Sequence, residues 1–178
     1  MSSHTLSVLV ENQSGVLARV AALFARRGFN IDSLAVGETE DPAVSRMTIV
    51  VDARNSSIEQ ISKQLHKLIN VLRICELPKD AAVERELALV KVNSSRPTKA
   101  EIVEIADIFK AKVVDVTPTS MVLEASGASE KIDALEELLV PFGILEIVRT
   151  GRIALGRGPS GLKAPNPHPI TLVRAAAS

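Results

Sequence analysis

Two hydrophobic periods alternate in the first half of the chain, one typical of strands and one typical of helices. Four segments alternate apolar and polar residues as strands do. These strands are predicted at residues 4–11, 29–38, 43–52 and 71–77. Two helical stripes lie between them, formed by Val16, Val20, Leu23 and Phe24 and by Ile58, Ile61, Leu65 and Leu68. Gly28 is placed to end the first helix, and Ser56 with Glu59 predicts a capping box for the second.

The second half repeats this order of elements with little shared sequence. Strands are predicted at residues 84–93, as a pair within 112–127, and at 144–155. The helical stripes are Ile102, Ile105, Ala106 and Phe109, and then Ile132, Leu135 and Leu139. Thr98 with Glu101 predicts a capping box just after Pro97, and Ser129 is predicted to cap the last helix. The sequence therefore predicts an α+β protein of two ferredoxin-like βαββαβ units in tandem.

Breaks in this pattern set the predicted domain boundaries. The first domain is expected at residues 4–78 and the second at residues 84–158, joined by a linker at 79–83. Residues 159–178 are rich in proline and glycine and have no apolar period. We therefore expect a mobile tail there.

Composition narrows the class of protein. Lys plus Arg and Asp plus Glu both total 21, so no net basic charge indicates nucleic acid or an anionic lipid surface. The single cysteine, Cys75, cannot form an internal disulfide, and its alternating neighbours predict a buried strand thiol. The chain shows neither a signal-peptide pattern nor the ~20 apolar residues of a membrane span. These features predict a soluble, cytoplasmic protein.

Ferredoxin-like folds carry many functions, so function has to be argued from sites. A metal carrier would need paired cysteines, and His4, His66 and His168 are too scattered for a shared metal site. An RNA-binding sheet would need aromatic residues, but the chain has four Phe and no Trp or Tyr. Arg19 falls inside the first predicted helix, where we expect it to be solvated, rather than in the loop that a small acyl-phosphate hydrolase would use. No catalytic residue is predicted, and the chain is not expected to be an enzyme by itself.

Residues 12–15, between the first strand and the first helix, contain an amide, a hydroxyl and a glycine. A helix N-terminus offers free N–H groups and partial positive charge to a carboxylate. Asn12 could accept from an ammonium group or donate to a carboxylate, and Gly15 would leave room for a ligand. A purely structural interpretation is that Ser14 caps, Gly15 turns and Asn12 bonds within its own loop. The residues alone leave both interpretations open.

One long run of sequence narrows this choice. Residues 6–51, "LSVLVENQSGVLARVAALFARRGFNIDSLAVGETEDPAVSRMTIVV", are followed by "VERELALVKV", "VVDVTPTSMVLEASG" and "EIVRTGRIALGRG". The first run resembles an ACT domain, the small-molecule sensor of amino-acid metabolism. Residues 4–158 as a whole resemble the regulatory small subunit of acetolactate synthase, also called acetohydroxyacid synthase.

The resemblance implies a non-catalytic regulatory subunit. In that family the catalytic large subunit joins two 2-oxo acids with thiamine diphosphate, Mg2+ and FAD, in the first shared step toward valine, leucine and isoleucine. The small subunit raises this activity and makes it sensitive to feedback inhibition, usually by valine. The resemblance therefore implies a homodimer that binds a large subunit and a branched-chain amino acid, with no cofactor or metal on this chain.

The resemblance also implies where the effector binds, because ACT domains of this family pair across a two-fold axis with valine between them. By position, the expected contacts are Asn12, Ser14, Gly15 and Val16 of one chain and Asn30 and Ile31 of the other. Leu17 would line the apolar part of the pocket with Val16. One methylene in such a pocket changes binding by only ~1–3 kcal/mol, so valine, leucine and isoleucine are not separated.

Three further expectations concern the rest of the chain. Residues 93–100 have no N-x-x-G pattern and Pro97 removes a donor at the helix start, so we predict dimer contact or signal transmission there and no effector site. Arg46 is either part of the surface that grips the catalytic subunit or a solvated hairpin charge. A different function remains open, namely a stand-alone double-ACT sensor acting on another enzyme or on transcription.

Overall fold

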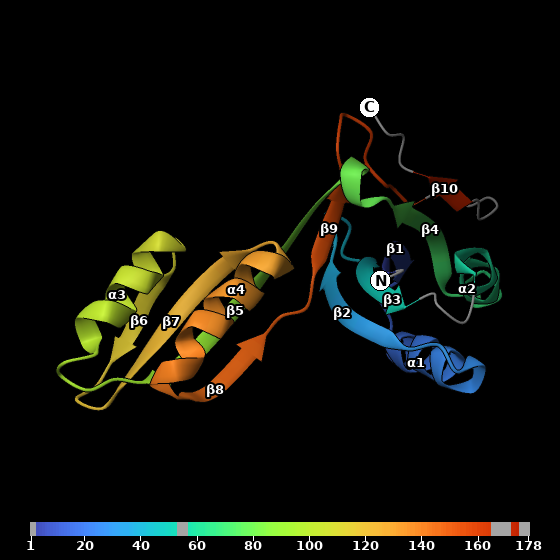
Figure 1. The fold of residues 1–178 in the computed structure, drawn as a ribbon. Helices are drawn as coiled ribbons and strands as arrows, with labels where there is room; N and C mark the ends of the chain where they lie inside the picture. The colour runs from blue at the N-terminus through green and yellow to red at the C-terminus, as the bar shows by residue number, and fades with distance from the viewer. Residues whose placement is uncertain (1–2, 53–56, 165–171, 175–178) are drawn as a thin grey trace. The chain divides into compact units, whose positions relative to one another are not determined.

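The computed structural model describes residues 3–52, 57–164 and 172–174, which form two compact units (Figure 1). The first unit combines Met1–Val83 with Arg152–Ser178, and the second unit is Glu84–Gly151. Within each unit, two helices pack on one face of a mainly antiparallel sheet. The predicted α+β class and the repeated βαββαβ order are confirmed.

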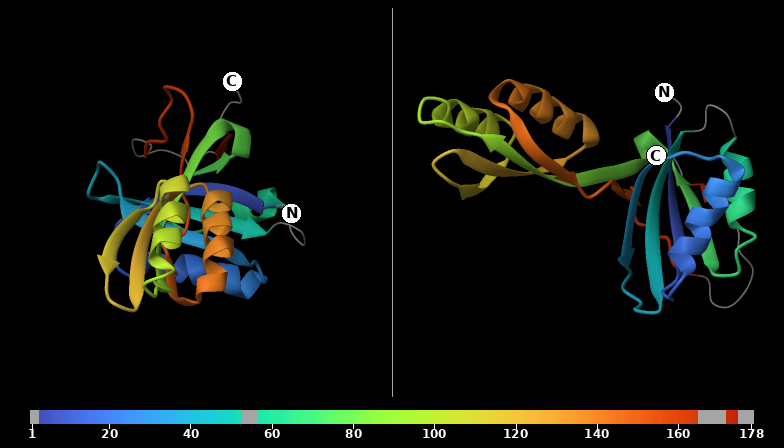
Figure 2. Two further views of the ribbon diagram at one scale, coloured as in Figure 1. Left: turned by 60° about the vertical axis from the view of Figure 1, so that its left-hand side comes forward. Right: turned by 90° about the horizontal axis from the view of Figure 1, so that it is seen from below.

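The first unit is built around a sheet of order β10-β4-β1-β3-β2. Its elements are β1 (Ser3–Glu11), α1 (Val16–Arg27), β2 (Ile31–Glu38), β3 (Val44–Asp52), α2 (Ile58–Leu65), β4 (Val71–Leu77) and β10 (Leu172–Arg174). Strands β1 to β4 pair antiparallel, whereas β10 pairs parallel with β4. The two helices cover the same face of this sheet (Figure 2), which we call its inner face.

Apolar residues of β1 and the stripe of α1 form half of the buried first core, and β3, α2 and β4 supply the rest. Leu6, Val8 and Val10 are fully buried on the inner face. Phe24 of α1 packs edge-to-face on Phe29, with ring centroids 5.9 Å apart. Gly28, with φ 67°, then ends the helix in the left-handed conformation that glycine adopts without strain.

The second unit has a sheet of order β6-β7-β5-β8 with α3 and α4 on one face. Its elements are β5 (Ala82–Asn93), α3 (Lys99–Ile108), β6 (Lys112–Val116), β7 (Ser120–Gly127), α4 (Ser129–Leu139), η2 (Val140–Phe142) and β8 (Ile144–Arg149). The short helix η1 (Lys79–Ala81) precedes β5. Both predicted helical stripes face the core, where Ile102, Ala106, Ile132, Leu135 and Leu139 are buried.

The helix caps differ from those predicted. Ser57, rather than Ser56, caps α2 by accepting a backbone N–H of that helix, and Ser56 lies outside the described residues. Thr98 precedes α3, but its hydroxyl accepts from the N–H of Ser95 instead of a helical N–H. Ser129 is the first residue of α4 and not its cap. The capping pattern in the sequence therefore does not decide which residue, if any, caps each helix with its side chain.

The strand predicted at residues 144–155 is divided between the two units. Strand β8 pairs with β5 in the second unit, whereas β9 (Ile153–Gly156) belongs to the first. Gly151, with φ 79°, interrupts the strand between them. The backbone N–H of Arg152 then donates to Ser33 Oγ on β2 at 2.8 Å. The chain thus returns to the first unit at residue 152, earlier than the predicted boundary at residue 158.

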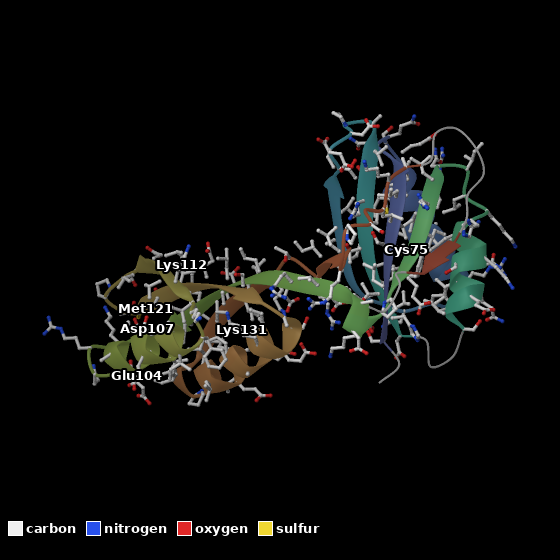
Figure 3. All side chains as sticks on the ribbon, turned by 90° about the horizontal axis from the view of Figure 1, so that it is seen from above. Cys75, Glu104, Asp107, Lys112, Met121 and Lys131 are labelled. Atoms are coloured by element: carbon white, nitrogen blue, oxygen red, sulfur yellow. The ribbon has the colours of Figure 1, made fainter. Side chains whose placement is uncertain are left out.

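Residues 157–164, which we call the strap, continue from β9 in the first unit. Arg46 Nη2 donates to the carbonyl oxygen of Leu162, and Arg73 Nη1 donates to that of Lys163, both at 3.1 Å. Leu162 also packs on a cluster of Cys75, Leu77, Ala82 and Ala154. Cys75 is buried, as predicted, and is labelled on β4 in Figure 3. The strap and these side chains define the outer face of the sheet.

The strap corrects the expectation of a tail without fixed contacts. Its composition indicates mobility because it is rich in glycine and proline. Its attachment, however, depends on backbone carbonyls, which every residue type provides and no composition signal reveals. Strand β10 adds a further contact on β4, and the other tail residues lie outside the described ranges.

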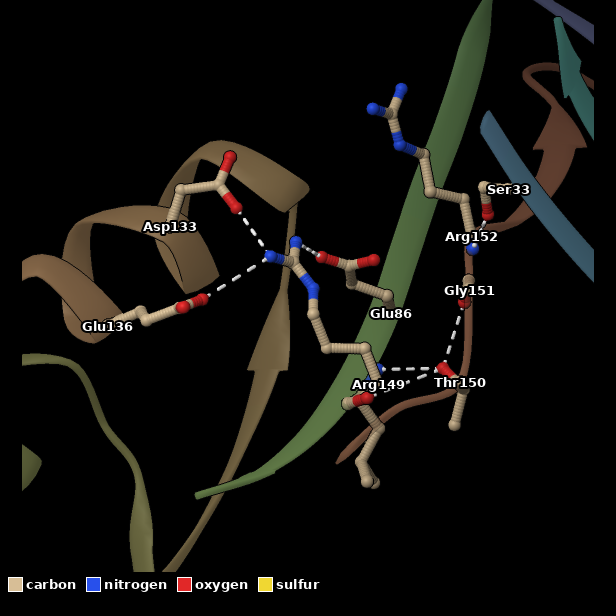
Figure 4. Close-up of polar contacts among 9 residues, drawn as sticks. Ser33, Glu86, Asp133, Glu136, Arg149, Thr150, Gly151 and Arg152 are labelled. Carbon is tan, nitrogen blue, oxygen red and sulfur yellow. Dashed lines mark hydrogen bonds and ion pairs between the residues drawn. The ribbon is translucent and has the colours of Figure 1, made fainter. Parts of the chain in front are cut away.

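One charged cluster joins α4 to the sheet of the second unit (Figure 4). Arg149, at the end of β8, contacts the buried carboxylate of Glu86 and lies 2.6 Å from Asp133 and 3.7 Å from Glu136. Burial alone would lower the pKa of Arg149, but the hydrogen bonds and the charge attraction of Asp133 and Glu86 together outweigh burial and raise the pKa. Glu86 therefore has a permanent countercharge.

Replacing Arg149 by Met is expected to destabilise the second unit by roughly 3 kcal/mol, because it leaves the buried Glu86 carboxylate uncompensated. The double variant Arg149→Met/Glu86→Gln should recover much of this loss. Urea unfolding of the full chain measures both. Lys91→Met is the control, since the Lys91–Glu146 pair is exposed and should contribute less than ~1 kcal/mol. A double variant no more stable than Arg149→Met would contradict the explanation.

Candidate functional site

Residues 12–15 form the loop between β1 and α1. No side chain of this loop caps the start of α1. Gly15 stands immediately before α1 with φ 81°, and Arg19 N–H makes the first helical hydrogen bond, to Gly15 O at 3.0 Å. A Cβ on Gly15 would meet nothing within 4 Å. The backbone angle, and not a lack of space, therefore favours glycine here. Ser14 does not cap the helix, so the structural interpretation of its hydroxyl is wrong.

Asn12 attaches this loop to the hairpin between β2 and β3. Its backbone N–H donates to Ala43 O at 2.8 Å, and its Nδ2 donates to Pro42 O at 2.9 Å and to Glu38 Oε1 at 3.1 Å. The interpretation that Asn12 bonds only within its own loop is therefore wrong. Both amide hydrogens are engaged, so Oδ1 is the side-chain atom suited to a ligand, as an acceptor for an ammonium group.

A polar network that sequence reasoning missed lies beside this loop. Arg19 donates to Asn70 Oδ1, and Asn70 Nδ2 donates to Glu11 Oε2 at 2.6 Å. Glu11 N–H donates in turn to Asn70 O at 2.9 Å. Asn70 is only 7% exposed. The expectation that Arg19 is simply solvated is wrong, because its partner lies 51 residues away and no local pattern reveals it.

The two apolar residues expected to line the pocket have different environments. Val16 is 3% exposed and belongs to the core of the first unit, so its side chain does not face the loop's exposed side. Leu17, the next residue of α1, is 44% exposed. Ile69, which precedes Asn70, is 86% exposed. Leu17 and Ile69 are therefore the accessible apolar side chains in the segments next to the loop.

Asn30 and Ile31 lie at the opposite end of the sheet from this loop. Ile31 pairs with Val51 of β3, whereas Glu11, just before the loop, pairs with Val44. Seven residues of β3 separate these positions, which is roughly 23 Å at strand spacing. Asn30 Nδ2 donates locally, to Asp32 Oδ1 at 2.6 Å. Within one chain the structure brings together Asn12, Ser14, Gly15 and Val16 but not Asn30 and Ile31.

The corresponding loop of the second unit is closed by its own side chains. The Ser95–Thr98 hydroxyl contact of 3.0 Å and the Ser95 N–H bond to Thr98 Oγ1 hold the turn before α3. Lys99, the first residue of that helix, donates from Nζ to Thr117 O at 2.7 Å. The absence of an effector site there stays a prediction, consistent with this geometry.

Other candidate chemistry is limited among the described residues. No group of three or more His, Cys, Asp or Glu in residues 3–52, 57–164 and 172–174 is placed to hold a metal ion. His4 Nδ1 lies 2.9 Å from Glu76 Oε1, burial lowers the pKa of His66, and His168 lies outside the described residues.

Among the residues that the structure describes, no helix has the length and apolar character needed to cross a membrane.

Arg46 is held within its own chain. Its guanidinium is half-buried and bonded to the strap, so the interpretation of a solvated hairpin charge is wrong. A direct grip on the catalytic subunit stays a prediction.

Comparison with known proteins covers both units. A family model described as an AHAS small subunit-like ACT domain matches residues 6–73, and one described as small subunit of acetolactate synthase matches residues 85–158. The acetolactate synthase small subunit of Mycolicibacterium smegmatis is 55% identical, over 91% of this chain and 95% of its own length. A probable acetolactate synthase small subunit of Archaeoglobus fulgidus is 49% identical, over 87% and 97%.

A solved structure has the same arrangement of elements. The crystal structure of the acetolactate synthase small subunit from Thermotoga maritima superposes with a TM-score of 0.84 at 41% identity, covering 90% of this chain and all of that one. These matches favour the small-subunit interpretation over a stand-alone sensor. The chain therefore belongs to the family of acetolactate synthase small subunits, which regulate a catalytic large subunit and are not catalytic by themselves.

Proposed function

We propose that this regulatory subunit is a homodimer that binds valine, or a related branched-chain amino acid, between its N-terminal units and thereby inhibits the catalytic subunit it activates. The observation that carries the proposal is the uncapped start of α1 at Gly15, beside the Asn12 amide. Thiamine diphosphate, Mg2+ and FAD are assigned to the catalytic subunit, which performs the chemistry.

An edge strand supports the pairing of two chains. Strand β2 ends the order of the first sheet, so one of its backbone edges is available to a second copy. A two-fold axis through the middle of β2 would pair it antiparallel with the partner's β2. The start of each β2 would then lie beside the end of the other. Asn30 of one chain would thus approach Glu38 of the other, to which Asn12 is hydrogen-bonded.

The loop offers a suitable contact for each part of an α-amino acid. Free N–H groups and the partial positive charge at the start of α1 favour the effector carboxylate. Asn12 Oδ1 and the Glu38 carboxylate can accept from its ammonium group. Leu17, half-exposed in the first turn of α1, suits an aliphatic side chain. In this proposal Asn30 and Ile31 of the second chain complete the pocket.

Inhibition requires that the effector bind two states of the dimer unequally. A ligand held between two chains has this property when the angle between the chains differs in the activating and inhibited states. If valine changes the affinity of the dimer for the catalytic subunit, the catalytic subunit changes the affinity of the dimer for valine by the same factor. A loop mutation that weakens valine binding but leaves the contact with the catalytic subunit unchanged is expected to reduce inhibition while activation persists.

Gly15→Asp is expected to abolish inhibition by valine while activation of the catalytic subunit persists. The new carboxylate would repel the effector carboxylate and weaken valine binding by about tenfold or more, which is ~1.4 kcal/mol. The reconstituted complex is assayed against valine concentration. Gly15→Asn is the matched control, because it has the same size and the same tolerance of positive φ but no charge. Equal inhibition of the Asp variant and the wild type would contradict the site.

A hybrid dimer tests whether the site is shared between chains. Asn12→Ala and Asn30→Ala homodimers should both lose valine binding. A hybrid of the two variants has one site with both asparagines intact and one site with neither, because each site takes Asn12 and Asn30 from different chains. Titration calorimetry of a purified, differently tagged hybrid should show about half the wild-type stoichiometry. A hybrid that binds no valine would overturn the shared site.

A further inference from the structure

A second pocket lies on the outer face of the first unit, between the sheet and the strap. It has a volume of about 230 Å3. Ser7 of β1, Arg46 of β3 and Leu77 of β4 form its floor, and Ala154 and Leu162 contribute from β9 and the strap. Ser7 pairs with Thr48 and Cys75 across the sheet, away from the α1 side. This pocket is therefore separate from the loop proposed for valine.

Arg46 brings a positive charge into this pocket, and the described residues supply no countercharge for it. Its guanidinium makes one hydrogen bond, to Leu162 O, and no carboxylate among the described residues lies within ion-pair distance. The sequence outside the described ranges contains no Asp or Glu. Burying a charge is costly unless it is paired. A guanidinium has five N–H donors, so several remain available for an anion.

Ser7 supplies a second polar group. Its side chain is 1% exposed, and its Oγ has no hydrogen-bond partner among the described residues. Buried polar atoms in native proteins are nearly always bonded, so an unbonded hydroxyl in a pocket wall indicates a ligand or ordered water. Ser7 and Arg46 both line the cavity and both can donate to a carboxylate oxygen.

The other residues that line the pocket, together with its volume, indicate which kind of anion it can bind. Leu77 and Ala154 are buried and Leu162 is half-buried, so much of the lining is aliphatic. A single guanidinium matches one negative charge better than the two of a phosphate monoester. The volume is below the roughly 300–1,000 Å3 of pockets for larger ligands. An α-ammonium group would meet Arg46 and no lining carboxylate, which disfavours amino acids.

We propose that this pocket binds a short aliphatic monocarboxylate that lacks an amino group. Its carboxylate bonds to the Arg46 guanidinium and the Ser7 hydroxyl, and its hydrocarbon part packs on Leu77, Ala154 and Leu162. Such a ligand touches both the sheet and the strap, so its binding holds the strap closed over Cys75. The regulatory subunit then senses a second class of small molecule, independently of valine.

The test uses the full chain carrying Asn12→Ala, which removes the proposed valine site, with butyrate as the probe. Butyrate should give binding heat and should slow the reaction of Cys75, the single cysteine, with a thiol reagent. Arg46→Gln should weaken binding at least tenfold. Ser7→Ala should weaken it several-fold without lowering the melting temperature, because its hydroxyl has no partner to lose.

Arg73→Gln is the matched control, since Arg73 holds the adjacent strap carbonyl but does not line the pocket. It should bind butyrate as the parent chain does. Absence of butyrate heat, or equal heat in the Arg46→Gln variant, would overturn the proposal. Binding of inorganic phosphate or 2-aminobutyrate as tight as that of butyrate would also overturn it, because the pocket would then not select an aliphatic monocarboxylate. None of these outcomes bears on valine binding, which the Asn12→Ala background excludes.

Discussion

The central strand β1 is the element on which the rest of the first unit depends. It is hydrogen-bonded to β3 on one side and to β4 on the other, and its side chains are buried on both faces. Its inner residues meet α1 and α2, and its outer residues meet the strap. A strand held on four sides has little freedom, so groups attached to it have precise positions. The loop with Asn12 is its direct continuation, and Ser7 lies near its middle.

This arrangement gives the regulatory unit two different kinds of surface. The end of β1 leads into an exposed helix start, which is suited to a ligand shared with another chain. The outer face of β1 is enclosed by the chain's own later residues, which is suited to a ligand held within one chain. The β2–β3 hairpin and β3 connect the two surfaces. Ala43 of the hairpin accepts the Asn12 N–H, and Arg46 of β3 follows three residues later. A shift of the β2–β3 hairpin would therefore move groups both at the Asn12 loop and in the pocket that contains Arg46.

Local periodicity predicts the features of this fold that local physics determines. The stripe that includes Val20 and Phe24 identified α1 because helical spacing and burial coincide in one segment. Ser57 replaced Ser56 as a cap because two adjacent hydroxyls satisfy the same pattern. Val16 was assigned to a pocket because an apolar residue beside a loop suits either pocket or core. Its position in α1 decides for the core.

Features made by distant residues could not be predicted from the sequence. The Arg19–Asn70 bond joins residues 51 positions apart, and the strap is held through carbonyl oxygens, which carry no sequence signal. The remote position of Asn30 follows only from the strand register, and its proposed role comes from family resemblance. The fold was thus largely readable from one chain, whereas a site shared by two chains was accessible only by analogy.

The return of the chain at Arg152 makes the second unit an insertion within the first. The first unit is therefore not one continuous stretch of the gene, although its ACT-like strands and helices are. A gene fragment that stops before β9 would encode these elements but not the strap. Cys75 and Leu77 would then lose the contacts with Ala154 and Leu162 that cover them. The shorter product would expose this apolar cluster to solvent, and exposed apolar clusters of this kind promote aggregation.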